Sequence, residues 1–582
     1  MERLVSAALL LVLACTTVAD LGAAGKQAPS KEPDLCIVPP GAQPLLPAQL
    51  LPGMGQTKNF FVTTRSEDAR RFFLQGLSQI HSFWFVESER SCLQAATLDP
   101  EMAMAYWCIA VSAASDYRPA FQLMRTGPAA RANSSDIVAR TTNGAAIDPQ
   151  IRAKEAIDKA SWLKALVTPR ERLYIESQAA RRSKSDPADG DAAYVSALRK
   201  LVAAYPDDLD AKSMLGLALD NGFEPVSRTP REHTLEAIQL LEAVVARDDD
   251  HFGAHHYLIH AYEGSRTPEK AWHACERYVA LVPNIPHALH MPGHIYAQSD
   301  RIPQAVAAFT AAAENELTWL KADSLYPNGH HGHNVHFLVH ALNLAGKYRD
   351  SRTWVDRLLT FKETPRERSG NNQRVAWRQA YFALIKTLVR FEKWDDILDG
   401  RTIPIYDRPE QSAWRLWAIG LAEAAKGDRP RAAAALSELK KQVDRVTAAN
   451  EPFNVAVIEL DATIAARFGS PKKGFDLFKR AADREQAMLY TEPPAYPRPV
   501  AEAMGNVALA VNAFAVAERA FGRALEQEPG SGRAYFGLAA ALQHLGKSDA
   551  ARDARERALK AWADADSDLP QLAALSSFVA QR

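Results

Sequence analysis

The chain has 582 residues, of which 47% are hydrophobic and 24% are charged, a composition ordinary for a soluble globular protein. Its 69 basic and 69 acidic residues cancel to a formal net charge of zero. This balance argues against nucleic acid or an anionic membrane surface as the main partner. The length suits several domains or one long array of repeats.

The N-terminus carries an export signal. An apolar run from Leu4 to Ala14 follows Met1-Glu2-Arg3, and it is too short to span a bilayer. We predict a signal peptide over residues 1–19, with two processing routes open: cleavage after Ala19, or lipidation of Cys15 in a loose bacterial lipobox. Either route predicts an extracytoplasmic protein of the periplasm or cell envelope, and the second adds a lipid anchor to the membrane.

Residues 20–60 are predicted to form a flexible tether, because residues 20–56 are rich in Pro, Gly, Ala and Gln. The later cysteines Cys92, Cys108 and Cys275 lie in helical patterns without metal-type pairing, so we expect buried free thiols. A disulfide between Cys92 and Cys108 stays open as the alternative in an oxidising compartment.

A 34-residue period begins after the tether. From Ala69, an aromatic residue, a glycine, an alanine and a proline stand at positions 4, 8, 27 and 32 of the repeat, and a C-terminal copy starts at Arg498. Small residues at positions 8, 20 and 27 let two helices approach closely, and larger apolar residues fill the remaining space. No strand-like alternation of useful length is present, so the pattern predicts an all-α solenoid from about residue 60 to 565.

This pattern resembles the tetratricopeptide-repeat (TPR) superfamily over most of residues 65–565. The resemblance implies stacked helix pairs with a concave groove lined by the first helix of each pair. We divide the array into N-terminal repeats at 65–250, histidine-rich repeats at 251–360 and C-terminal repeats at 361–582.

The histidine-rich repeats hold thirteen of the sixteen histidines of the chain, between His251 and His340. His256 and His260 are followed by Glu263, three residues on. Two later sets then repeat the helical spacing i, i+3, i+7, which places their side chains on one helix face; they are His287, His290 and His294, and His333, His336 and His340.

In repeats starting at Phe252, Pro286 and Gly332, these side chains occupy positions 2, 5, 9 and 12, which are not the packing positions. The TPR resemblance implies that they face the groove. Neighbouring first helices lie about 8–10 Å apart, so their imidazoles could converge on one ion. We therefore predict a metal site at His256, His260, Glu263, His287, His290, His294, His333, His336 and His340.

We expect positions 5 and 9 of all three repeats to point into one cavity, with His287, His333 and Glu263 near its rim. A nitrogen-rich site without thiolate favours copper or zinc, with iron as a further option. For Glu263 three roles stay open: metal ligand, partner of an imidazole, or general base.

The remaining histidines carry weaker signals. His255 is expected to face the core, His273 the solvent, and His251 to cap a helix. His330 and His331 precede the third set and could support it. The isolated His81, His233 and His544 are expected to be structural.

The segments HFGAHHYLIHAYE, PHALHMPGHIY and HHGHNVHFLVHAL resemble a bacterial exported TPR family with the motifs H-x-G-A-x-H-Y-x-I-H-x-x-E, H-M-P-x-H-I-Y and H-N-x-H-F. Members of that family are named only for the repeat, so the resemblance implies an architecture and a shared set of histidines but no reaction.

Two classes of function remain open. The first is an extracytoplasmic metalloprotein, including a metalloenzyme, with its centre in the groove. The second is a non-catalytic TPR scaffold that binds a peptide or an envelope protein in that groove. The sequence carries no G-x-S-x-G, no phosphate-binding loop and no H-E-x-x-H, so it does not decide whether the protein is an enzyme.

Overall fold

The computed structural model describes residues 47–57, 60–115, 149–322, 328–362, 375–446, 451–488 and 494–577. The predicted signal peptide, Cys15, Cys36 and residues 20–46 of the predicted tether lie outside this part of the chain. The described end of the tether corrects the prediction of flexibility. Met54 is buried, Leu51 donates its N–H to Gln75, and Asn284 donates its N–H to Gly53.

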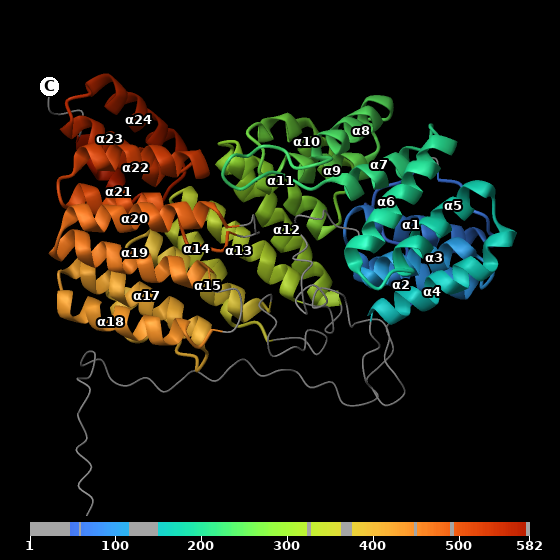
Figure 1. Cartoon of the computed structure of the whole chain (residues 1–582), viewed down its shortest axis with the longest axis horizontal. Coiled ribbons are helices and arrows are strands. Elements are labelled where there is room, and N and C mark those ends of the chain that lie inside the picture. Colours follow the sequence, from blue (N-terminus) through green and yellow to red (C-terminus); the bar gives the residue numbers. More distant parts are fainter. Residues whose placement is uncertain are drawn as a thin grey trace, which may run out of the picture.

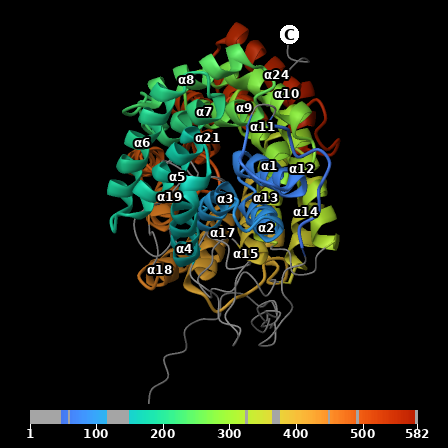
Figure 2. The same ribbon diagram turned by 90° about the vertical axis from the view of Figure 1, so that its right-hand side faces the viewer.

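The described residues form helices in consecutive antiparallel pairs and no β-strand, apart from an isolated bridge between Phe223 and Pro230. This confirms the predicted all-α, TPR-like solenoid. The pairs stack along a curved array, with α1–α6 at one end, α8–α12 in the middle and α17–α24 at the other (Figure 1). Figure 2 looks along the array from its N-terminal end.

The N-terminal helices are α1 (Glu67–His81), α2 (Phe85–Leu98), α3 (Ala103–Ala114), α4 (Pro149–Leu163), α5 (Pro169–Arg182), α6 (Pro187–Ala204), α7 (Leu209–Leu219) and α8 (Thr234–Arg247). The histidine-rich helices are α9 (Phe252–Tyr262), α10 (Trp272–Leu281), α11 (Pro286–Gln298), α12 (Ile302–Ala322), α13 (Gly329–Leu344) and α14 (Tyr348–Leu359). Short 3₁₀ turns occupy Lys164–Leu166 and Pro268–Ala271.

The C-terminal helices are α15 (Ala376–Arg390), α16 (Trp394–Leu398), α17 (Pro409–Lys426), α18 (Arg429–Val443), α19 (Glu451–Phe468), α20 (Pro471–Gln486), α21 (Val500–Ala510), α22 (Phe514–Gln527), α23 (Gly532–His544), α24 (Ser548–Ala561) and α25 (Pro570–Ser577). None of the described helices is long and apolar enough to cross a membrane.

Helix starts follow from capping chemistry. Six helices begin at a side chain that accepts a backbone N–H of the first turn. These capping residues are Ser66, Asp186, Asp208, Asp428, Ser470 and Ser531. At α5, Thr168 and Glu171 form a complete capping box ahead of Pro169.

Contacts between a glycine on one helix and an aromatic ring on the other set the distance between the two helices of a pair. A Cβ built on Gly293 would lie 2.4 Å from the ring of Phe309, and one on Gly505 would lie 2.7 Å from the ring of Phe521. Both pairs are sixteen residues apart, at positions 8 and 24 of the repeat, as the sequence pattern predicted. Because these glycines have no side chain, the second helix of each pair seats its aromatic ring against the backbone of the first.

One connected apolar core runs from Met54 to Val507. The predicted boundaries at 250 and 360 therefore divide a continuous array rather than separate domains. The last residue of α1 also reaches α9 directly, since His81 Nδ1 lies 2.8 Å from the hydroxyl of Tyr257.

Cys92 and Cys108 form a disulfide, with Cα atoms 5.8 Å apart, while Cys275 is a buried free thiol. The expectation of free thiols was right for Cys275 and wrong for this pair. The helix spacing explains the difference, because α2 and α3 pack in register and place both sulfur atoms beside Gly76 of α1.

We expect Gly505→Ala to lower the stability of the α21–α22 pair by about 1–3 kcal/mol, because the added methyl group must displace the ring of Phe521. Gly522→Ala on α22 is the matched control, since nothing lies within 4 Å of its built Cβ. The control should be neutral or stabilising by about 0.5–1 kcal/mol. Hydrogen exchange of α21 and α22 measures both, and equal effects would contradict this packing.

Candidate metal centre

The tightest group of histidines joins α9 to the start of α11. His256 Nε2 lies 3.0 Å from His260 Nε2 and 3.2 Å from His287 Nε2. Within the described part of the chain, this trio is one of two places where three side chains bring metal-type ligand atoms within 4.8 Å of one another. His256 and His260 are one helical turn apart on α9, and His287 reaches them from the first turn of the neighbouring first helix.

Two contacts decide which nitrogen of these rings carries a proton. His256 Nδ1 lies 2.5 Å from the carbonyl oxygen of His81, which can only accept, so Nδ1 is the N–H donor. His260 Nδ1 likewise lies 3.2 Å from Oε2 of Glu263 and donates to that carboxylate. In the neutral rings both Nε2 atoms then carry no proton, and their lone pairs face one another across 3.0 Å.

Burial disfavours the protonated form of these imidazoles. It lowers the pKa of His256 to about 3, and it holds the pKa of His287 well below its usual value, helped by the neighbouring histidines. His256 and His260 are both essentially inaccessible to solvent. His256 and His287 are therefore neutral imidazoles, and their Nε2 atoms meet that of His260 at one point.

A second group lies on α11 and α13. His290 Nε2 is 2.7 Å from His294 Nε2, and the rings of His290 and His333 are 4.8 Å apart. Glu263 joins the two groups, because its Oε1 lies 3.7 Å from His294 Nδ1. Glu263 directly follows α9 and is buried, so its carboxylate hydrogen-bonds one imidazole and lies near a second from the neighbouring repeat.

The sequence did not predict the contribution of α12. Glu316 is buried there, and its Oε2 lies 2.6 Å from His330 Nδ1 and 3.0 Å from the side-chain nitrogen of Asn334. His330 stands between the two groups, with ring centroids 5.9 Å from both His287 and His333. The carboxylate of Glu316 thus comes from α12, a long helix of 21 residues that precedes the third histidine set.

Two of the predicted ligands face a different environment. His336 packs edge-on against Phe382, and His340 Nε2 lies 3.9 Å from Oε1 of Glu528. Burial lowers the pKa of both imidazoles, and the nearby Lys386 lowers them further. Positions 5 and 9 of the third repeat therefore turn toward α15 and α22, and the structure does not gather all three repeats around one point as expected.

The predicted open groove is corrected in part, because the α9 histidines are covered while His287 and His333 stay partly exposed. Phe83, in the turn between α1 and α2, places its ring 4.5 Å from His256, 5.3 Å from His260 and 5.6 Å from His287. Phe83 adopts a positive φ of 53°, a backbone conformation that non-glycine residues rarely take. The first repeat thereby closes over the histidine trio.

His81 was expected to be merely structural, yet it orients the site. Its Nε2 lies 3.1 Å from the buried Asp210, its Nδ1 contacts Tyr257, and its carbonyl holds His256. His251 caps α9 and lies 3.5 Å from Asp210. A Cβ on Gly253 would lie 2.6 Å from the His81 ring, so only glycine permits this approach.

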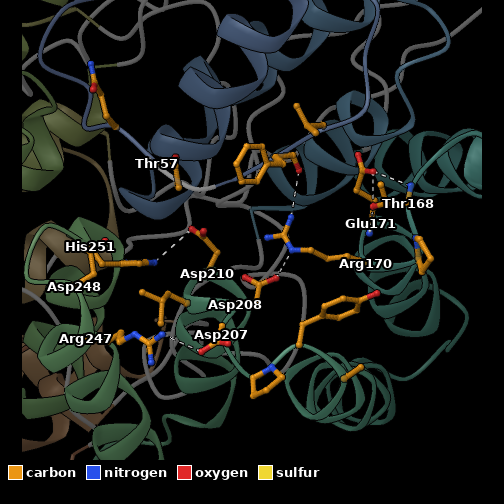
Figure 3. Close-up of a pocket in the computed structure, with 18 of the residues that line it drawn as sticks. Thr57, Thr168, Arg170, Glu171, Asp207, Asp208, Asp210, Arg247, Asp248 and His251 are labelled. Carbon is orange, nitrogen blue, oxygen red and sulfur yellow. Dashed lines mark hydrogen bonds and ion pairs between the residues drawn. The ribbon is translucent and has the colours of Figure 1, made fainter.

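Asp210 and His251 also line a cavity of about 940 Å³ between the described end of the N-terminal segment and the first turns of α5, α7 and α9 (Figure 3). Its charged side chains pair with one another. Arg170 binds Asp208, and Arg247 binds Asp207. Thr63 donates to Glu171 and so anchors the N-terminal segment. Among the described residues that line the cavity, no three ligand-type atoms meet within 4.8 Å.

The other histidines behave as expected where the structure describes them. His255 is buried, and the side chain of His273 is 64% exposed. With Asp249 they form the second cluster of ligand-type atoms, but Asp249 and His273 are solvent-exposed and make an ordinary ion pair of 2.7 Å.

Comparison with known proteins gives little further information. No protein-family model matches the chain, and no curated protein matches its sequence. Among solved structures it is similar to a human IFIT1 dimer with m7Gppp-AAAA, at 12% identity and a TM-score of 0.33, over 87% of this chain and 92% of that one. A human IFIT1 dimer with PPP-AAAA gives 12% identity and a TM-score of 0.31, over 86% and 92%. A likeness of this strength says nothing of ligands or partners for this chain.

We expect the metal-free protein to lose stability as the pH falls below about 6.5, the pKa of a histidine in the unfolded chain. The folded-state pKa of His256 is lowered to about 3, so between these values the unfolded state binds a proton that the folded state does not. His256→Gln should therefore flatten the pH dependence of the unfolding free energy near pH 5 by about 1.4 kcal/mol per pH unit. An unchanged slope would show that His256 is not held neutral.

Proposed function

We propose that this protein is an extracytoplasmic TPR-like metalloprotein that holds a transition-metal ion at His256, His260 and His287. The observation that carries the proposal is the pair of bare Nε2 atoms of His256 and His260. Their lone pairs face one another at 3.0 Å in a site that excludes a further proton. Lone pairs in this arrangement repel unless a cation lies between them, and a metal ion is the cation that imidazole binds best.

The distances fit that ion. Two ligands at about 2.0–2.1 Å from a tetrahedral metal are about 3.3–3.4 Å apart. The separations of 3.0 Å and 3.2 Å in the trio come within a few tenths of an ångström of this value. Three imidazoles leave a fourth position open, which is the arrangement of catalytic rather than structural metal sites.

The donor set favours zinc or copper. All three ligands are imidazoles, and no cysteine sulfur belongs to the clusters of ligand atoms among the described residues. Neutral imidazole suits zinc, copper, iron and nickel, and disfavours calcium and magnesium. An ion bound there with an open position would act as a Lewis acid and lower the pKa of a bound water toward neutrality.

Glu263 acts in this proposal as a positioning carboxylate rather than as a general base. One oxygen lies 3.2 Å from His260 Nδ1 and the other 3.7 Å from His294 Nδ1, so the carboxylate sits between two imidazoles. A carboxylate behind a ligating histidine fixes its tautomer and raises its basicity. His290 lies next to the trio, with its ring 6.2 Å from that of His287, and is placed to bind a second ion or the ligand of the first.

Two features support an extracytoplasmic location. The apolar run from Leu4 to Ala14 is typical of a secretory signal, and the Cys92–Cys108 disulfide suits an oxidising compartment. The scaffold alternative needs an open groove for a peptide. The packing of Phe83 over His256 and His260, both buried, favours the metalloprotein over that alternative.

We expect elemental analysis of protein purified without a histidine tag to find zinc or copper bound to the full chain. His260→Ala should lose most of that metal, because it removes one of three ligands. His273→Ala is the matched control, since it removes an exposed histidine from the neighbouring α10. Metal-free wild type after exposure to zinc and copper, or equal metal content in both variants, would contradict the proposal.

A second prediction isolates the role of Glu263. Glu263→Gln keeps the size of the side chain but removes the charge behind His260, so metal affinity should fall by about 10–100-fold. Competition with a chelator of known affinity measures this change. Circular dichroism of the metal-free variant should match wild type, and an unchanged affinity would assign Glu263 a purely structural role.

A further inference from the structure

A cavity of about 550 Å³ borders the histidine centre on its other side. It lies between the α7–α8 loop and α11 on one side, and α20 and the start of α21 on the other. The two sides touch at its rim, where Arg228 donates to the carbonyl oxygen of Glu526 at 3.0 Å. Its volume is within the range of small-molecule binding sites, about 300–1,000 Å³.

The cavity shares a wall with the histidine groups. His294 lines it, and Nε2 of the same side chain lies 2.7 Å from His290. Phe337 lines it too, and its ring packs 4.5 Å from His294 and 5.0 Å from His290. A molecule in the cavity would therefore meet the edge of the histidine cluster directly.

The walls of the cavity suit a flat, apolar ligand. The rings of Phe337 and Tyr496 both line the cavity, together with Met488, Leu344 and several prolines. Tyr496 is held in place from behind, since its hydroxyl donates to Glu459 at 2.6 Å and its ring packs 5.9 Å from Trp417. Fixed aromatic rings and a methionine are favourable partners for an aromatic ligand.

One end of the cavity is polar and suits a negatively charged group of a ligand. Arg498 lines it, with a guanidinium 3.0 Å from Glu459, and His340 lines it with the charges of Lys386 and Arg390 acting on its ring. Four glutamates line the cavity, and Glu224 and Glu526 lie at its exposed rim, where Arg231 binds Glu224. The other two do not oppose an anion. Glu528 is bound by Arg390, and burial raises the pKa of Glu485 to about 8, so it is a neutral hydrogen-bond donor at pH 7.

We propose that this cavity binds an aromatic organic anion, with its charged head toward Arg498 and Glu485 and its ring against Phe337, beside His294. The functional meaning of the site, as the substrate pocket of the metal centre, rests on the proposed function. Binding itself does not, because none of the groups that would hold the ligand is among the proposed ligands His256, His260 and His287.

The test uses the metal-free full chain and the fluorescent anion 1-anilinonaphthalene-8-sulfonate. Ala297→Trp fills the cavity from α11, where Ala297 is partly exposed and lines the space. We expect saturable binding of the probe to wild type and about tenfold weaker binding to this variant. Ala434→Trp, on an exposed face of α18 in the middle of the helix, is the matched control and should bind as wild type does.

A neutral probe with the same naphthyl-phenyl skeleton, N-phenyl-1-naphthylamine, tests the charge. It should bind about tenfold more weakly than the sulfonate, because it offers Arg498 and Glu485 no anionic acceptor. Should Ala297→Trp melt at a lower temperature than the control, Ala297→Leu gives a smaller step with the same expected direction.

Three outcomes would overturn the proposal: no saturable binding to wild type, equal affinity for wild type and Ala297→Trp, or equal affinity for the two probes. Metal content is measured separately in each protein and should be the same in Ala297→Trp as in wild type. If neither protein holds metal while the probe still distinguishes them, the metal centre fails and the ligand cavity stands.

Discussion

The hydrogen bond from His256 to the carbonyl oxygen of His81 is the contact on which the histidine cluster depends. A neutral imidazole has one donor and one acceptor nitrogen, so fixing one of them decides the other. The bond contributes only about 1 kcal/mol to folding by itself. Its larger effect is directional, because it turns a bare nitrogen toward His260 and His287 and leaves no place in the buried site for a compensating proton.

That contact depends in turn on close packing within and between repeats. Gly253 lets the ring of His81 approach α9, and Gly293 lets Phe309 seat α12 against α11. Each is a position where any side chain would push two helices apart. Because the imidazoles must meet within tenths of an ångström, the glycines of the scaffold govern the chemistry of the site although none of them contacts an ion.

The sequence predicted what is local or periodic. The 34-residue period predicted the helix pairs, and positions 8 and 24 predicted the Gly505–Phe521 contact. Helical spacing also placed His256 and His260 on one face, where the structure has them. These features follow from 3.6 residues per turn and from helix-to-helix distance, which the chain encodes within one repeat.

What the sequence did not predict comes from parts of the chain far apart. Phe83 and His81 cover a site about 175 residues away, and no pattern inside either segment indicates that contact. Glu316 lies in a helix whose spacing marks it as an ordinary second helix. His336 shares the register of His290 but turns to Phe382 and Lys386, because the curvature of the array carries each repeat away from the last.

The turn that carries Phe83 has a consequence for how an ion arrives. Its ring packs against all three imidazoles of the trio, and its backbone is held in a conformation that costs of order 1–3 kcal/mol. Lifting this turn away from α9 would uncover His256 in the proposed metal centre, and the stored strain favours that opening. Under the proposed function, the rate of metal exchange would depend on the first helix pair, and the affinity on the fifth and sixth pairs, α9–α10 and α11–α12.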